Sequence, residues 1–262
     1  SNYYGSIDEN GNLLTENIDL LINATTVVRA IAISQDSQFL NSFIETNSYF
    51  INQAHTMSVI SIAGEEIDNL LYGNQIRPIG SFEIFDQDGV LIDEAVGEFN
   101  KHGNDSWAYD QRGVDFIIRD QYGYNYAIND KLFTTKNRDS FQRLILKAAA
   151  NDNYPATFGS PAHIRDSYVH SLSQIGGLRM DERSHESCIL YVNGEYWGVY
   201  DYREKVDDID FLNYYYDQGE GYVDFLKTWG ATWVEFGDNT TENEWDNLVD
   251  FITGNDMSDV DN

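Results

Sequence analysis

The segment YVNGEYWGVYDYREKVDD, residues 191–208, combines a turn signal with aromatic and charged side chains that can bind a ligand. Asn193-Gly194 is a strong signal for a two-residue hairpin loop. Because side chains alternate along a strand, the returning strand then presents one set on a single face: Tyr196, Gly198, Tyr200, Tyr202 and Glu204. The glycine between two tyrosines permits close approach of a planar ligand or of a packed ring from a neighbouring strand, and both interpretations stay open.

Two further groups of residues resemble metal sites but are better explained otherwise. An EF-hand loop around Asp86 and Asp88 would require Ile84 and Ala95 as its first and twelfth ligands, so this cluster predicts a turn. His163 and His170 are seven residues apart on an expected helix, which is too far for one metal ion. We therefore expect no metal site in this chain.

The placement of cations is more informative than the net charge of −28. Residues 101–205 hold 13 of the 16 Lys and Arg, whereas residues 1–100 hold two against 15 acids. An anion-binding site is therefore expected in the middle of the chain. The alternative is that these cations only pair with local acids on the surface.

Composition sets the class of protein. The chain has 262 residues and is 42% hydrophobic and 14% aromatic, which indicates a folded protein of one large or two modest domains. The acid excess opposes binding to nucleic acid or to anionic membranes. Cys188 lies in an apolar run and is expected to be buried, and no stretch is long and apolar enough to span a membrane. Because the chain lacks an initiating Met, we expect a piece of a longer or processed polypeptide with any secretion signal upstream.

Strand patterns dominate the first half. Residues 25–34 and 42–51 read as strands, and with the Asn10-Gly11 turn they predict part of a small all-β sandwich over residues 1–54. Residues 57–63 follow as a strand and 64–74 as a short helix. Hairpins about Asp88-Gly89 and Tyr122-Gly123 then predict an antiparallel β-meander.

Helices are expected in the second half. Residues 160–177 have Ser160 as the N-cap and Pro161 in the first turn. The apolar stripe of this helix is expected to be Ile164, Tyr168, Leu172 and Ile175. Residues 206–217 look helical. Residues 240–256 carry a Thr241–Glu244 capping box before an apolar face. The predicted class is α+β, an antiparallel β-meander with flanking helices.

A signature segment and five further motifs in chain order resemble the CotH kinase family, the spore-coat protein H group of secreted or spore-surface bacterial kinases with an atypical protein-kinase-like fold. The segment that resembles the family signature is LYVNGEYWGVYDYREKVD. GEFNKHGNDSW is similar to the family's glycine-containing loop, and RGVDFIIRDQYG to its following strand. KLF and FQRLILKAAANDN resemble its Leu-Phe and LRNSGND elements, and AHIRDSYVHSL its Arg-Asp helix. The resemblance covers about residues 56–260. A weaker one links ATTVVRAIAIS…SYFI to the end of a chitobiase C-terminal-like β-sandwich.

The resemblance implies a kinase-like N-lobe and hinge over residues 55–262, with ATP and Mg, Mn or Ca as cofactors. By this resemblance, Gly103, Asn104 and Ser106 belong to a phosphate-covering loop, where glycine lets backbone N–H groups approach phosphate. Arg112 aligns near a phosphate-binding Lys or Arg, although QRGVD replaces the usual KKS pattern.

The remaining implied site residues lie further along the chain. Arg165 and Asp166 form a polar pair that orients the site, and Tyr200 and Glu204 line the hinge side of the nucleotide. The family's catalytic and metal-binding Asp motifs are expected downstream of Asn262. This stretch is therefore expected to bind nucleotide weakly and to turn over little.

The function implied is part of a secreted kinase that transfers phosphate from ATP to Ser or Thr of extracellular or surface proteins. Whether this stretch is itself an enzyme stays open. The alternative is a non-catalytic adhesion or polysaccharide-associated module, in which the face around Tyr196 and Trp197 binds sugar or another surface protein.

Overall fold

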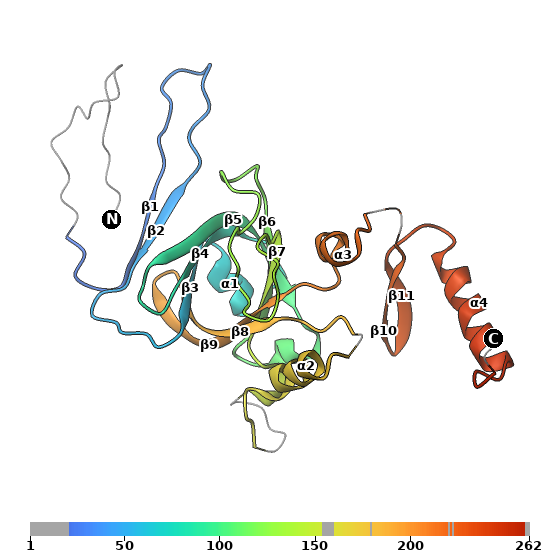
Figure 1. Ribbon diagram of the computed structural model, residues 1–262. Coiled ribbons are helices and arrows are strands. Elements are labelled where there is room, and N and C mark those ends of the chain that lie inside the picture. The colour runs from blue at the N-terminus through green and yellow to red at the C-terminus, as the bar shows by residue number, and fades with distance from the viewer. Residues whose placement is uncertain (1–20, 154–159, 179, 220, 222, 260–262) are drawn as a thin grey trace. The chain divides into compact units, whose positions relative to one another are not determined.

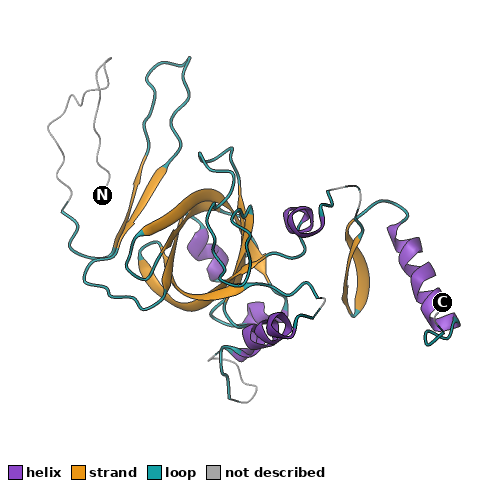
Figure 2. Cartoon of the chain, viewed as in Figure 1, coloured by secondary structure: helices purple, strands orange, loops and turns teal. Residues whose placement is uncertain are grey.

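The computed structural model describes residues 21–153, 160–178, 180–219, 221 and 223–259. Within them the chain is a mixed α+β protein in which strands outnumber helices (Figure 2). This confirms the predicted α+β class, whereas the antiparallel β-meander stays a prediction. The Asn10-Gly11 turn lies outside the described residues, so the β-sandwich over residues 1–54 and its boundary stay predictions. Among the helices described, none is long and apolar enough to cross a membrane.

Seven strands form a closed barrel in the order β3-β4-β5-β6-β7-β9-β8 (Figure 1). The strands are β3 (Ser58–Ala63), β4 (Ile79–Phe85), β5 (Leu91–His102), β6 (Gly113–Ile118), β7 (Arg143–Lys147), β8 (His185–Val192) and β9 (Glu195–Glu204). Closure removes the exposed edges of the sheet. The predicted turns at Asp88-Gly89 and Asn193-Gly194 join β4 to β5 and β8 to β9. At the second turn both residues have positive φ, 50° and 84°, as a type I′ turn requires.

By compactness the chain divides into two units. The first comprises the residues up to Lys101, Ile118–Tyr126 and Ser187–Tyr200. The second comprises His102–Ile117, Ala127–Glu186 and the residues from Asp201 on. The candidate site described below lies in the second unit.

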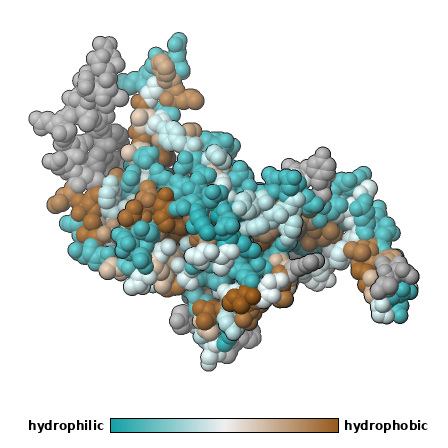
Figure 3. Space-filling view, viewed as in Figure 1, coloured by the Kyte–Doolittle hydropathy of each residue, from teal (hydrophilic) through white to brown (hydrophobic). Residues whose placement is uncertain are grey.

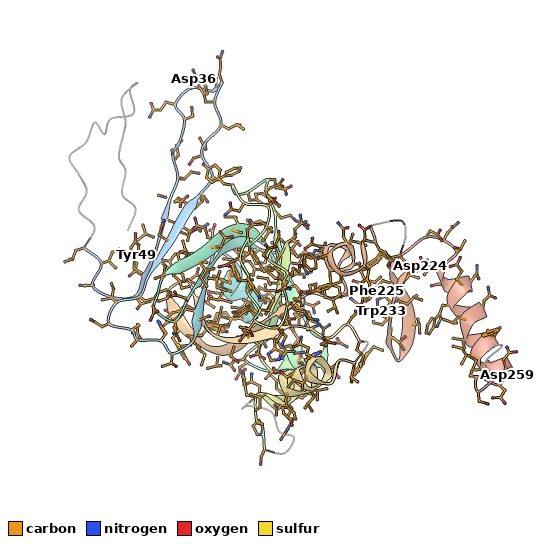
Figure 4. The ribbon with its side chains drawn as sticks, viewed as in Figure 1. Asp36, Tyr49, Asp224, Phe225, Trp233 and Asp259 are labelled. Carbon is orange, nitrogen blue, oxygen red and sulfur yellow. The ribbon has the colours of Figure 1, made fainter. Side chains whose placement is uncertain are left out.

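The first unit contains β3, β4 and a two-stranded hairpin. The hairpin pairs β1 (Thr26–Ala30) with β2 (Glu45–Tyr49), and Asp36 lies at the tip of the intervening loop (Figure 4). The helix α1 (Ile67–Leu71) contacts β4, because its Ile67 side chain packs directly on Gly80. Ile67, Leu70 and Leu71 are fully buried, so α1 is part of the core of this unit. Cys188 is buried, as predicted.

The second unit contains β7 together with two helices that follow it. These are α2 (Arg165–Gly176) and α3 (Ile209–Tyr216). Further along lie the hairpin of β10 (Phe225–Trp229) and β11 (Ala231–Phe236), then α4 (Thr241–Gly254). Phe225 and Trp233 lie on this hairpin (Figure 4). The fully buried residues of the unit include Phe116, Phe133, Phe141, Leu144 and Leu146.

The predicted helix over residues 160–177 begins later than expected, at Arg165. The reason is Asp152, whose carboxylate accepts hydrogen bonds from the N–H groups of Ala162 and Arg165 at 2.8 and 3.0 Å. The carboxylate of Asp152 therefore accepts hydrogen bonds at the start of the helix, which is the role that was expected of Ser160 as the N-cap.

The predicted apolar stripe of α2 faces solvent (Figure 3). Tyr168 is 59% exposed and Ile175 is 83% exposed, whereas Ser167 and Ser173 are buried. The helix therefore packs through its polar face, because that face joins the charge network described below.

Two other local predictions were wrong. No strand returns after Tyr122-Gly123, because Gly123 packs on Val96 and the Asn125 side chain donates to the Glu94 carbonyl at 2.6 Å. At α4 no Thr241–Glu244 capping box forms. Instead Thr240 is the N-cap, and the hydroxyl of Thr241 donates to Asp224 at 2.5 Å.

The turn interpretation at Asp86 is confirmed. One oxygen of its carboxylate accepts hydrogen bonds from the N–H groups of Asp88 and Val90 at 2.9 and 2.8 Å. This is the local side-chain-to-backbone bonding typical of an Asx turn.

Candidate functional site

The loop between β5 and β6 is built around glycine. Gly103 has φ +99°, and a Cβ there would collide with the hydroxyl of Ser106. A 3-10 turn, η1 (Asp105–Ala108), follows, and the N–H of Trp107 donates to the carbonyl of Asn104 at 3.0 Å. Gly103, Asn104 and Ser106 are therefore together in one tight turn, and their role in covering phosphate stays a prediction. Such a turn permits close approach of its backbone to a ligand.

Arg112 contacts the loop between β5 and β6 through Trp107. Its Nε donates to the Trp107 carbonyl at 2.9 Å, and the centre of its guanidinium lies 5.8 Å from the Trp107 ring centroid. Trp107 itself is buried. The side chain of Arg112 is thus engaged with the loop, and in this geometry it holds the loop's shape.

The base of the loop lies beside the end of β7. A Cβ on Gly113 would lie 3.2 Å from the Leu146 carbonyl and 3.3 Å from the His102 carbonyl. In addition, η1 contacts a second 3-10 turn, η2 (Ala150–Asp152), which follows β7. The loop therefore adjoins the chain just before and after Lys147.

Lys147 ends β7 and takes part in a cluster of charges on α2 and β9. Its ammonium lies 3.8 Å from the carboxylate of Asp166, in the first turn of α2. Arg203 on β9 makes an ion pair with the same carboxylate, and its Nη2 lies 3.0 Å from Asp201. Since Lys147 is paired with Asp201 and Ile145 with Arg203, the two cations share one face of the sheet.

Three cations, Lys147, Arg203 and neighbouring Arg183, meet two carboxylates in this cluster, Asp166 and Asp201. Burial lowers the pKa of Lys147, and neighbouring Arg203 and Arg183 lower it further, although Asp166 opposes them. Burial raises the pKa of Asp166, but Arg203 and Lys147 outweigh it and hold that pKa below its usual range. Asp166 is therefore a carboxylate at neutral pH, and a partly buried ammonium stands beside it. A phosphate group is the kind of anion that such paired cations bind.

The backbone after Lys147 is strained. Ala149 and Ala150 have φ values of 56° and 50°, in the left-handed region that non-glycine residues rarely occupy. Backbone in such conformations persists only where the surroundings hold it, and it concentrates at functional sites. The N–H groups of Asp152 and Asn153 donate to the carbonyls of Ala149 and Ala150 at 3.0 and 3.1 Å, and both of these later residues are buried.

Arg165 and Asp166 are adjacent in sequence but contact different charged groups. The guanidinium of Arg165 lies 2.9 Å from Asp152 and is 57% exposed, so it anchors the entry to α2. Burial raises the pKa of Asp152, whereas hydrogen bonds from Ala162 and Arg165 lower it further than burial raises it. Of the implied pair, only Asp166 reaches Lys147.

Glu204 lies away from this cluster. It is paired across strands with Leu144, on the face of β9 opposite to Arg203. It is fully buried, and its Oε1 accepts hydrogen bonds from Arg138 at 3.4 Å and from the hydroxyl of Tyr215 at 2.9 Å. Burial and the Glu204 carboxylate raise the pKa of Tyr215. Glu204 is therefore held by protein groups in the interior.

The other residues of the predicted aromatic face have different surroundings. Tyr200 is fully buried, and Tyr202 is buried with its hydroxyl donating to the Leu132 carbonyl at 3.3 Å. Tyr196 is 61% exposed. Trp197 is partly buried, with its ring centroid 5.9 Å from that of Tyr72.

A second network of charges follows β9. Lys205 lies 2.9 Å from Asp115 and 3.3 Å from Asp207, and His102 Nδ1 lies 2.8 Å from Asp115. Lys227 also pairs with Asp207. Burial would raise the pKa of Asp207, but Lys205 and Lys227 hold it at about 2. This network links β5, β6 and the chain after β9 by alternating charges, so it stabilises the base of the loop.

The structure thus brings together the loop residues Gly103, Asn104 and Ser106, the end of β7 and Asp166. It places Arg112 and Arg165 in supporting positions, and Glu204 on another face. Lys147 and Arg203 were not singled out from the sequence. The signal for Lys147 was a lysine closing the apolar strand LIL within the cation-rich middle, which resembles the strand lysine of protein kinases.

The residues described do not include a ready-made metal centre. Among them, no group of three or more His, Cys, Asp or Glu side chains is placed to hold a metal ion. The cluster at Lys147 fits the phosphates of a nucleotide, because it presents cations and a glycine turn. It does not fit a divalent cation by itself.

Comparison with protein families agrees with this geometry. The model of the family described as CotH kinase protein matches residues 102–256, from the start of the loop to the end of α4. This is more than half of the chain and contains every residue of the Lys147 cluster. A comparison with curated proteins found no match. The chain belongs to the CotH kinase protein family.

Proposed function

We propose that this chain forms the phosphate-binding part of a secreted CotH-type kinase that uses ATP to phosphorylate Ser or Thr of extracellular or surface proteins. The observation that carries the proposal is the ion pair between Lys147 at the end of β7 and Asp166 at the start of α2. In protein kinases a strand lysine and a helix carboxylate form such a pair, and the lysine contacts the phosphates. Bound ATP supplies the phosphoryl group.

Each residue of the cluster has a defined part in this proposal. Lys147 binds phosphate oxygens, and Asp166 holds the ammonium in place. Arg203 is 1% exposed and is tied to Asp166 and Asp201, so it fixes the position of Asp166 from the interior. The turn at Gly103 presents backbone N–H groups beside this point. The described residues support binding and orientation of phosphate, and no step through Mg, Mn or Ca is derived from them.

The test is a calorimetric titration of the chain with ATP. Lys147→Met is expected to weaken binding by about tenfold, because one phosphate-facing charge is lost in a partly buried site. Burial already disfavours the ammonium, so Lys147→Met should fold at least as well as the parent. Lys131→Met is the matched control, because Lys131 is exposed and its ammonium donates a hydrogen bond to Asn137 at 3.3 Å.

Equal loss in both variants would contradict a specific role for Lys147. If the chain bound no ATP but did bind a glycan, the second reading, a polysaccharide-associated module, would replace the first. Loss of glycan binding on Tyr196→Ala would then assign that activity to the exposed aromatic of β9.

A further inference from the structure

A different site lies in the first unit, where the β1–β2 hairpin covers the outer face of the barrel strands β4 and β5. Ser48 of β2 donates to both oxygens of Glu83, from its N–H at 2.9 Å and its hydroxyl at 2.6 Å. Glu83 is 2% exposed and is paired directly across the strands with Glu94. Like charges directly opposite one another destabilise a sheet. This position therefore concentrates negative charge at a structural cost.

The charge has no counter-ion in the part of the chain that the structure describes. Among the residues described, neither Glu83, Glu94 nor Glu45 has a Lys, Arg or His within 4.0 Å. Burial raises the pKa of Glu83, and Glu94 and Glu45 raise it further, although Ser48 opposes them. Burial also raises the pKa of Glu94, and the charges of Glu45 and Asp93 raise it further. The pKa values of Glu83 and Glu94 are thus both raised by the charge of Glu45, as expected of acids that lie close together.

Two adjoining cavities lie beside this group, of which the first is lined by Glu45 and Glu94 and neither is lined by Glu83. Their volumes are about 150 and 190 Å³. The first is lined by Glu45 and Glu94 and by Phe43 and Tyr124, whose rings meet edge to face at 5.0 Å. Both cavities are bounded by Thr46.

Thr46 supplies an independent indication of a ligand. Its side chain is 95% buried, since the residue is 5% exposed, and its hydroxyl has no hydrogen-bond partner among the residues described. An unsatisfied buried hydroxyl is costly, because it has given up water without gaining a partner. A hydrogen-bonding ligand in the adjoining cavity would satisfy it.

We propose that this cavity binds an alkylammonium group, of the kind carried by a lysine side chain or a small diamine. Glu45 and Glu94 provide the negative charge, the Thr46 hydroxyl accepts a hydrogen bond from the ammonium, and the rings of Phe43 and Tyr124 favour a cation and cover its alkyl stem. The aliphatic wall of Ile44 and Val96 suits the same stem.

Two other ligand classes fit less well. Nothing in the described part of the chain groups three or more carboxylate or imidazole side chains for metal binding. Pockets for whole nucleotides or drug-sized molecules run from about 300 Å³ upward, so either cavity alone suits a single side chain.

The experiment is a titration of the whole chain near pH 7 with N-acetyl-lysine methylamide, followed by NMR or calorimetry. We expect millimolar binding, and about tenfold weaker binding of the analogue acetylated on Nε, which has the same stem but no charge. A parallel titration with 1,4-diaminobutane separates the two sources of the ammonium: tighter binding of the diamine assigns the site to polyamines, and tighter binding of the lysine derivative to proteins.

Matched variants locate the site. Glu94→Gln should weaken binding about tenfold. Glu98→Gln makes the same charge change on the same face of β5, outside both cavities, and should leave it unchanged. Thr46→Val should raise the melting temperature and weaken binding of the lysine derivative. Removal of a hydroxyl with only a structural role would leave that binding unchanged. No binding at about 10 mM, equal binding of the uncharged analogue, or full binding by Glu94→Gln would each overturn the proposal.

Discussion

Two arginines are almost equally buried but differ in what their carboxylate partners contact. Arg203 is tied to Asp166, a carboxylate that also meets Lys147. Arg138 is 2% exposed and is bound by Glu204 and Asp210, while its guanidinium lies 4.6 Å from the Phe141 ring centroid. Buried ion pairs contribute little net stability when intact, but the loss of one partner leaves the other uncompensated.

Glu204→Ala tests this distinction. Because it leaves Arg138 buried with one carboxylate partner fewer, the free energy of unfolding should fall by about 3 to 5 kcal/mol in urea denaturation. Binding of ATP to the remaining folded protein should be unchanged, since Glu204 lies on the face opposite to Arg203. Normal stability with lost ATP binding would instead place Glu204 at the nucleotide.

Asp207 gives a prediction for pH. Its pKa falls from 3.8 to about 2 on folding. A depressed carboxyl pKa contributes stability that is present above pH 3.8 and is lost as the pH falls toward 2. The contribution is about 2 kcal/mol, and it should be absent in Asp207→Asn. Urea denaturation at pH 5 and pH 2.5 should therefore show a larger loss in the parent than in Asp207→Asn. Asp36→Asn, at an exposed loop tip, should behave as the parent does.

The element that organises the candidate site is the connection from β7 to α2. It carries Lys147, the strained Ala149 and Ala150, and Asp152, which receives the N-terminus of α2. Asp166 follows in the first helical turn, where a carboxylate is favoured by the helix dipole. The connection from β7 to α2 thus sets the distance between Lys147 and Asp166.

Ala149→Gly tests the strain in this connection. Glycine adopts a positive φ without steric cost, so the variant should be more stable by about 1 kcal/mol and melt at a higher temperature. Ala148→Gly is the control, since its backbone is not in the left-handed region, and it should be destabilising. A loss of stability in both variants would mean that Ala149 is not strained.

At the scale of the whole molecule, local signals predicted more than long-range ones. The hairpin at Asn193-Gly194, the buried Cys188 and the helix after Thr240 follow from nearby residues and were predicted. The start of α2 could not be predicted from nearby residues, because the N–H of Arg165 donates to the carboxylate of Asp152, 13 residues earlier. Likewise the register of β9 correctly put Tyr200 and Glu204 on one face, but only the tertiary fold shows that Arg138 occupies the space beside Glu204.

The candidate site was predicted in part for the same reason. Scarce cations gathered in residues 101–205 indicated where an anion would bind, and the glycine turn at Gly103 was expected. Lys147 was missed because its role depends on strand pairing with β9 and on the packing of α2. These contacts connect residues 147, 166 and 203, and no local pattern encodes them.

The measurement that bears most directly on the central claim is a comparison of ATP and adenosine binding by the parent chain and by Lys147→Met. If Lys147 contacts phosphate, the variant should lose about tenfold in affinity for ATP and none for adenosine. If the two ligands lose affinity equally, or if ATP binds the variant as tightly as it binds the parent, Lys147 does not bind phosphate and the account is contradicted.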